Sequence, residues 1–94
     1  MELANVYFYA ANYLKFLNQT TKALACFLKS AKLRKEKGGT AYYNVALLLV
    51  QSGRKRKALE YFQKALELIE KEENIDNEYV IPQIYENIAL IYLG

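Results

Sequence analysis

The stretch Gly39–Glu70, GTAYYNVALLLVQSGRKRKALEYFQKALELIE, decides the fold of this chain of 94 residues. On both sides of Gly53 its apolar residues recur at steps of three and four, which is the spacing of one buried face on a helix. Glycine tolerates the left-handed backbone that a chain needs just past a helix end. The stretch therefore predicts two helices joined by a turn at Gly53.

The same pattern occurs in the sequence before this stretch. When the chain is displaced by 35 residues, Tyr7 falls on Tyr42 and Phe27 falls on Phe62. An incomplete third copy follows, in which Tyr85 matches Tyr42 at a displacement of 43 residues. Repeats of this length are typical of helix pairs that stack on one another. We expect one domain over 1–94, with copy one at about 4–35, copy two at about 39–70 and an incomplete copy three at about 82–94.

Local signals set the expected helix ends. Asn18 takes the place of Gly53 in copy one and also tolerates a left-handed backbone. Asp76 or Asn77 would cap the last helix, and Pro82 would lie in its first turn, where the missing N–H is tolerated. Alanines such as Ala11 would let paired helices approach closely. In the second helix the expected buried face is Ala23, Leu24, Phe27, Ala31 and Leu33. We expect helices near residues 2–17, 20–36, 40–52, 55–73 and 79–93.

The composition excludes several kinds of site. The chain has no His, so no histidine base or histidine metal ligand exists, and its single cysteine, Cys26, cannot build a multi-thiolate metal site. No Gly-rich phosphate loop or nucleophile elbow is present. We expect no enzyme, no cofactor and no metal. Val6–Leu17 is apolar but short and contains polar residues, so we expect no membrane segment and a cytoplasmic location.

Charge is distributed unevenly along the chain. Residues 1–58 hold eleven Lys and Arg against two Glu, a net charge of +9, and residues 59–94 hold two Lys against eight Asp and Glu, a net charge of −6. Lys32–Lys37 and Arg54–Lys57 are basic clusters that would permit a nucleic-acid patch. The first cluster ends a helix, where cations complement the helix dipole, and the second is a solvated turn and helix start. Nucleic acid is therefore not the expected partner.

These residues resemble the tetratricopeptide repeat family. In copy two Tyr42 stands at the position of a large aromatic residue, Val45-Ala46 at that of Leu-Gly, and only the closing Pro is replaced, by Glu70. Copy one departs from the family at Ala10-Ala11, Asn18 and Ser30. The remaining signature positions of copy two are Leu49, Gly53, Ala58, Phe62 and Ala65.

The resemblance implies a fold and a binding surface. It implies an all-α, right-handed superhelical stack of antiparallel helix pairs with five helices. The first helix of each pair would line a concave groove that holds a peptide or a helix. The chaperone-tail subtype is rejected, because Phe8, Gln83 and Asn87 stand where that subtype has its cations. The groove residues carried over are Phe8, Asn12, Lys15, Tyr43, Asn44, Leu47, Val50, Asn87 and Leu90.

The groove residues have competing interpretations. The three asparagines could form a ladder that holds the backbone of an extended peptide, because an amide offers both donors and an acceptor. They could also be solvated, or hydrogen-bond one helix to another. The apolar members would form an exposed interaction surface or be buried by neighbouring repeats.

Two classes of function follow. The first is a protein–protein interaction module with a protein or peptide partner in its groove and a scaffold or adaptor role. The alternative is a self-associating assembly unit, or a sensor or regulatory fragment of a larger protein. Self-association would use Tyr85, Ala89 and Tyr92, which present an apolar face of the last helix, and would give a homodimer or larger homo-oligomer.

Overall fold

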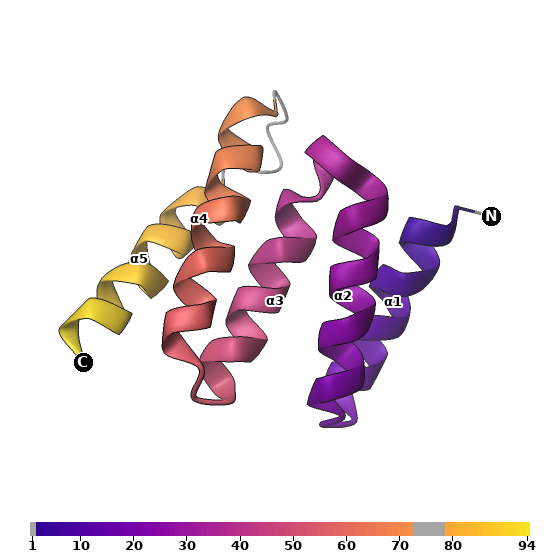
Figure 1. Cartoon of the computed structure of the whole chain (residues 1–94), viewed down its shortest axis with the longest axis horizontal. Coiled ribbons are helices and arrows are strands. Elements are labelled where there is room, and N and C mark those ends of the chain that lie inside the picture. Colours follow the sequence, from indigo (N-terminus) through magenta and orange to yellow (C-terminus); the bar gives the residue numbers. More distant parts are fainter. Residues whose placement is uncertain (1, 73–78) are drawn as a thin grey trace.

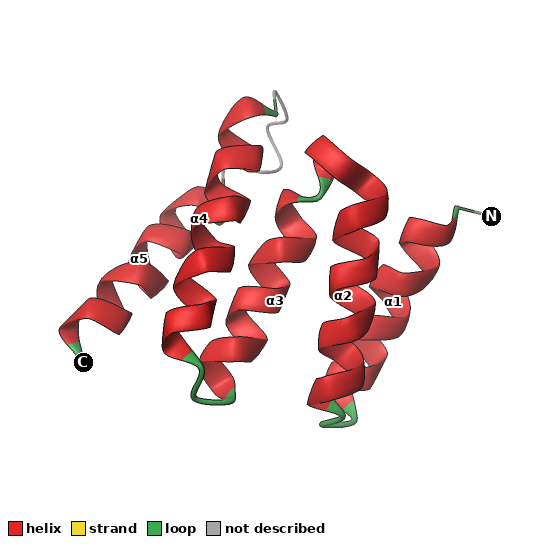
Figure 2. Ribbon diagram, viewed as in Figure 1, coloured by secondary structure: helices red, strands yellow, loops and turns green. Residues whose placement is uncertain are grey.

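The computed structural model describes residues 2–72 and 79–94, and these residues form helices and short connections without a strand (Figure 2). The helices lie side by side in chain order, with the two termini at opposite ends of the row (Figure 1). The expected all-α stack of antiparallel helix pairs is confirmed, and each helix ends within two residues of its expected position. The elements are α1 (Leu3–Phe16), α2 (Thr20–Arg34), the short 3₁₀ helix η1 (Lys35–Lys37), α3 (Gly39–Gln51), α4 (Lys55–Lys71) and α5 (Val80–Leu93).

The turns inside the two helix pairs have the same hydrogen bonds. After α3, Gly53 has φ +80°, and its N–H donates to the Val50 carbonyl at 3.0 Å. The next N–H, of Arg54, donates to the Leu49 carbonyl at 2.8 Å. After α1, Asn18 has φ +60°, and the bonds recur 35 residues earlier at 3.0 and 2.9 Å. Both turns are Schellman motifs, so the left-handed backbone expected at Asn18 and Gly53 is confirmed.

The core lies between the paired helices. Phe27 of α2 and Phe62 of α4 are fully buried, and alanines such as Ala11 and Ala46 have no exposed surface, which lets the helix backbones approach. Most of the expected α2 face is buried or half-buried, but Leu33 is exposed. The prediction for Leu33 is wrong because the buried stripe of α2 runs through Ala23, Phe27, Ser30 and Ala31 and would continue at position 34.

Ser30 fills a position where the family has Ala, and it forms a buried bond between helices. Its hydroxyl donates to the Ala4 carbonyl of α1 at 2.8 Å, and its side chain is fully buried. Replacing Ser30 by Ala is expected to lower the free energy of unfolding by about 1 kcal/mol, because the net contribution of this hydrogen bond to stability is lost. Urea unfolding measures the change.

Ser52 provides the matched control for Ser30. Its hydroxyl also donates to a helix carbonyl, that of Leu48 at 2.8 Å, but its side chain is exposed at a helix end. Ser52→Ala should change the free energy of unfolding by less than about 0.5 kcal/mol. Equal losses in the two variants would show that the bond between Ser30 and α1 adds nothing to stability.

The last helix packs on α4 through an apolar face. Ile84 is fully buried there, with Ile81, Ile88 and Ile91 half-buried against the same core. Pro82 lies in the first turn of α5, as expected. The expected caps, Asp76 and Asn77, lie outside the described residues. Among the helices that the structure describes, none is both long and apolar enough to cross a membrane.

Candidate functional site

The side chains expected in the groove come from the first, third and fifth helices. Eight of the nine are half-buried, neither fixed in the core nor fully in solvent, and the ninth, Leu90, is exposed. On α3, three of these side chains belong to residues that directly follow a buried residue: Tyr43 follows Tyr42, Leu47 follows Ala46 and Val50 follows Leu49. We call this set the α1–α3–α5 face: Phe8, Asn12 and Lys15 of α1, Tyr43, Asn44, Leu47 and Val50 of α3, and Asn87 and Leu90 of α5.

The three asparagines of this face adopt the same hydrogen-bonded arrangement. Each side-chain amide donates one N–H to the carbonyl four residues earlier in its own helix: Asn12 to Phe8 at 3.0 Å, Asn44 to Thr40 at 3.0 Å and Asn87 to Gln83 at 2.8 Å. No residue in 2–72 or 79–94 bonds to their amide oxygens. The amides therefore do not join one helix to another in the described chain. Each keeps an acceptor and a second donor for a partner.

An aromatic ring on this face packs against a buried phenylalanine in both complete copies. The Phe8 ring lies 5.5 Å from that of Phe27, at 76°, and the Tyr43 ring lies 6.1 Å from that of Phe62, at 52°. Edge-to-face and tilted contacts of this kind fix ring orientation. Phe8 and Tyr43 are thus held from below by the core, with their other sides half-exposed.

A side-chain hydrogen bond joins α3 to α5 on this face. The Tyr43 hydroxyl donates to the Gln83 side-chain carbonyl oxygen at 2.8 Å. Burial, and secondarily the negative charge of Glu86, raises the pKa of the Tyr43 phenol above its usual value of 10.0. The hydroxyl therefore stays protonated and remains a donor at neutral pH. The bond links α3, which carries Asn44, to α5, which carries Asn87.

Arg34 adds a cation beside this face that the sequence reasoning did not include. Its guanidinium lies 4.6 Å from the centre of the Phe8 ring and donates to the Asn5 side-chain oxygen at 2.7 Å. It lines a surface depression together with Lys37 and Glu2. The sequence does contain a signal for this cation. Arg34 aligns with Ile69 of copy two, which is buried, so a charged residue stands in copy one where copy two has an apolar one.

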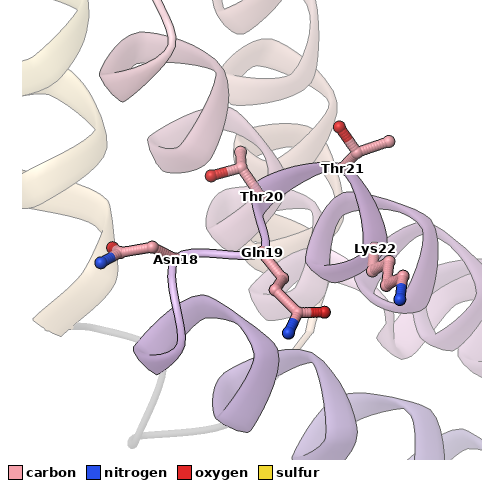
Figure 3. Close-up of a pocket in the computed structure, with 5 residues that line it drawn as sticks. All are labelled: Asn18, Gln19, Thr20, Thr21 and Lys22. Atoms are coloured by element: carbon pink, nitrogen blue, oxygen red, sulfur yellow. The ribbon is translucent and has the colours of Figure 1, made fainter.

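Two other depressions lie on the surface of the described residues. Figure 3 shows the turn at residues 18–22, where the side chains of Asn18, Gln19 and Thr20 point in different directions and do not converge on one point. A second depression, of about 290 Å³, lies between α2, α3 and α4, with Leu24 and Leu28 in its wall and Arg54 at its rim. It has no counterpart of the aromatic ring that the α1–α3–α5 face presents at the same position in both complete copies, Phe8 and Tyr43.

No cluster of three or more His, Cys, Asp or Glu able to hold a metal ion exists among residues 2–72 and 79–94. Cys26 is a free, half-buried thiol that packs against the core. The remaining expected site residues, Tyr85, Ala89 and Tyr92, are all exposed on α5.

A family model matches most of the chain. The family model described as tetratricopeptide repeat matches residues 1–71, which contain α1 to α4 and both complete copies of the repeat. The fifth helix lies outside the match, so its likeness to the repeat rests on its own residues, Tyr85, Ala89 and Tyr92. Neither the curated proteins nor the solved structures contain a match to this chain.

Proposed function

The chain belongs to the tetratricopeptide repeat family, and on that basis we propose that it is a protein-interaction module that holds a peptide or an amphipathic helix against its α1–α3–α5 face. Membership of the family indicates a protein–protein interaction module. Our proposal adds the binding face, the class of partner and a scaffold or adaptor role.

The repeated arrangement of Asn12, Asn44 and Asn87 carries the proposal. Three amides on three helices are fixed by the same bond to their own backbone, so they lose little rotational freedom when a partner binds. Each retains an acceptor and a donor, which is what a peptide unit of a partner backbone requires. A row of such amides would bind successive peptide units with little dependence on the partner's sequence.

Selectivity would come from the apolar members of the face. Phe8 and Tyr43 are oriented by the core phenylalanines beneath them, and Leu47 and Val50 continue the apolar surface along α3. Rigid aromatic rings contribute contact area at low cost in conformational entropy. The preferred partner is therefore an extended segment that offers both apolar side chains and free backbone groups to the face, or a helix with one apolar side.

The side chains of the α1–α3–α5 face are suited to binding. The face consists of amide, aromatic and aliphatic side chains with one lysine, Lys15, and the chain has no histidine to act as a general base. The phenol of Tyr43, whose pKa burial raises further above neutral pH, is protonated and serves as a hydrogen-bond donor. We therefore propose a binding role, without a reaction on the bound partner.

A peptide-display selection against the purified chain tests this proposal. The dissociation constant of each enriched peptide is then measured for the unmodified chain and for Asn44→Ala. We expect Asn44→Ala to weaken binding about tenfold, equivalent to about 1.4 kcal/mol, because a bonded amide in the middle of the face is lost. Thermal unfolding should change little, since Asn44 is bonded only to its own helix.

Gln63→Ala is the matched control, because it also removes a side-chain amide. Gln63 is exposed on α4, away from the face. The proposal requires that Gln63→Ala leave the affinity unchanged. If both variants bind the selected peptides as the unmodified chain does, the α1–α3–α5 face is not the binding surface.

A further inference from the structure

The depression between α2, α3 and α4 has an apolar lining. Val45 and Leu49 of α3 are buried and form its floor, and Leu24 and Leu28 of α2 are half-buried in one wall. Tyr61 of α4, also half-buried, lies in the opposite wall. A lining of this kind favours an apolar group of a ligand. We call this depression the α2–α4 groove and define it by Leu24, Leu28, Val45, Leu49, Arg54 and Lys57.

The size and place of the α2–α4 groove limit what can occupy it. Its volume of about 290 Å³ is at the lower limit of the roughly 300–1,000 Å³ of ligand pockets, which leaves room for one bulky side chain of a partner and too little for a cofactor. Figure 1 shows α3 between α2 and α4 in the row of helices. Leu47 of the α1–α3–α5 face is two residues from both Val45 and Leu49, which is about 200° around the helix axis. The groove and that face therefore lie on different sides of α3.

The charged residues that line the groove are both cations. They are Arg54 and Lys57, and both are exposed. Neither α2 nor α3 contains an Asp or Glu, and the first carboxylate of α4 is that of Glu60. Within residues 2–72 and 79–94, Glu60 forms no ion pair with either cation. Two cations that no carboxylate of the described chain neutralises thus lie beside an apolar floor.

Helix stability does not explain the place of these cations. Arg54 is the N-cap residue of α4 and Lys57 lies in its first turn, which contains no acidic residue. Positive charge at a helix N-terminus is opposed by the helix dipole, whereas Lys32 and Arg34 in the last turn of α2 are favoured by it. Residues placed against such a local preference are expected where a site has a function. The cations beside the groove are therefore suited to an anionic partner.

We propose that the α2–α4 groove is a second binding site, which takes one bulky apolar side chain of an acidic protein segment whose neighbouring carboxylates contact Arg54 and Lys57. A nucleic acid would use the two cations but leave the apolar floor without a contact. An uncharged apolar segment would fill the groove but leave the cations without one. An acidic segment with a bulky apolar residue matches both features. Because the groove and the α1–α3–α5 face lie on different sides of α3, each is filled independently of the other.

Three tripeptides with acetylated and amidated ends test the proposal. Asp-Leu-Glu carries both features, Asn-Leu-Gln lacks the charges, and Asp-Ala-Glu lacks the bulky side chain. Each is titrated into the whole chain while NMR signals are followed. We expect Asp-Leu-Glu to shift the backbone signals of Leu24, Leu28 and Leu49 and to leave the side-chain signal of Asn44 in place. Each of the other two should bind about tenfold more weakly, because one loses both ion contacts and the other most of its buried apolar area.

Two variants of the chain test the role of the cations. Lys57→Gln should weaken the binding of Asp-Leu-Glu about threefold, the size of effect that one exposed ion contact has. Lys55→Gln is the matched control, because it removes the same charge from the same basic cluster at a residue that does not line the groove. It should leave the affinity unchanged. Both side chains are exposed, so the fold should survive, as circular dichroism will show.

Three results would overturn the proposal. Equal losses of affinity in Lys57→Gln and Lys55→Gln would show that the tripeptide responds only to the overall charge of the chain. Groove signals that stay in place up to the solubility limit of Asp-Leu-Glu would show that the groove does not bind it. Groove signals that shift at lower concentrations of a single-stranded thymidine DNA than of the tripeptide would show a site for phosphates. The asparagine signals of the α1–α3–α5 face are followed separately, so none of these results bears on that face.

Discussion

Replacing Phe27 by Ala is expected to lower the free energy of unfolding by about 3–5 kcal/mol. The Phe27 side chain is fully buried between α1 and α2, where its ring also supports Phe8 at 5.5 Å. Its removal leaves a cavity that neighbouring alanines, such as Ala11, cannot fill. A domain of this size has a total stability of about 5–15 kcal/mol, so a large part of the stability is lost. Urea unfolding followed by circular dichroism measures the change.

Phe16 offers the same substitution without burial. It lies at the last position of α1 and is 80% exposed. Phe16→Ala should change the free energy of unfolding by less than about 0.5 kcal/mol, so the difference between the variants isolates the effect of the core. Comparable losses in Phe27→Ala and Phe16→Ala would mean that the core between α1 and α2 is not where the structure places it.

The second large effect is expected at the junction between the two helix pairs. A Cβ atom on Gly38 would lie 2.5 Å from the backbone carbonyl oxygen of Ala31 and 3.1 Å from that of Lys35. Backbone atoms cannot rotate away as a side chain can, so α3 would have to move relative to α2. We expect Gly38→Ala to cost about 3 kcal/mol of stability, the upper end of overpacking effects. Thermal unfolding provides the measurement.

Gly53→Ala is the control that separates two possible causes of lost stability, namely lack of space for a Cβ atom and an unfavourable backbone conformation. Gly38 has φ −86°, which any residue adopts, whereas Gly53 has φ +80° and open space where an added Cβ atom would lie. Gly53→Ala should therefore cost about 1 kcal/mol, from the left-handed backbone alone. If Gly53→Ala proves the more destabilising of the two, the junction has more room than the structure shows.

The helices and the turns inside each pair could be predicted because their signals are local. Apolar spacing fixes each helix, and Asn18 and Gly53 are residue types that tolerate the left-handed backbone seen there. Lys35 also has a positive φ, of 54°, but its residue type gives no such signal. Its conformation belongs to the junction of α2 with α3, where the structure packs one helix pair on the next, and that packing depends on residues distant in the sequence.

The candidate face could be predicted in part. Helical spacing and the family resemblance identified which residues it would contain. The bonds of Asn12, Asn44 and Asn87 to their own helices depend on side-chain rotamers, which the sequence does not determine. The sequence shows Arg34 as part of a basic cluster at a helix end, and its contact with Phe8 follows only once α1 and α2 are placed in space.

The most direct test of the binding face is an NMR titration with a selected peptide, in which the side-chain NH₂ signals of the asparagines and glutamines are followed. If the peptide binds at the α1–α3–α5 face, the signals of Asn12, Asn44 and Asn87 shift together with a single dissociation constant, while the signal of Gln63 on α4 stays in place. Shifts confined to backbone signals around Leu24 and Leu28, at the depression between α2 and α4, with the three asparagine signals unmoved, would contradict it.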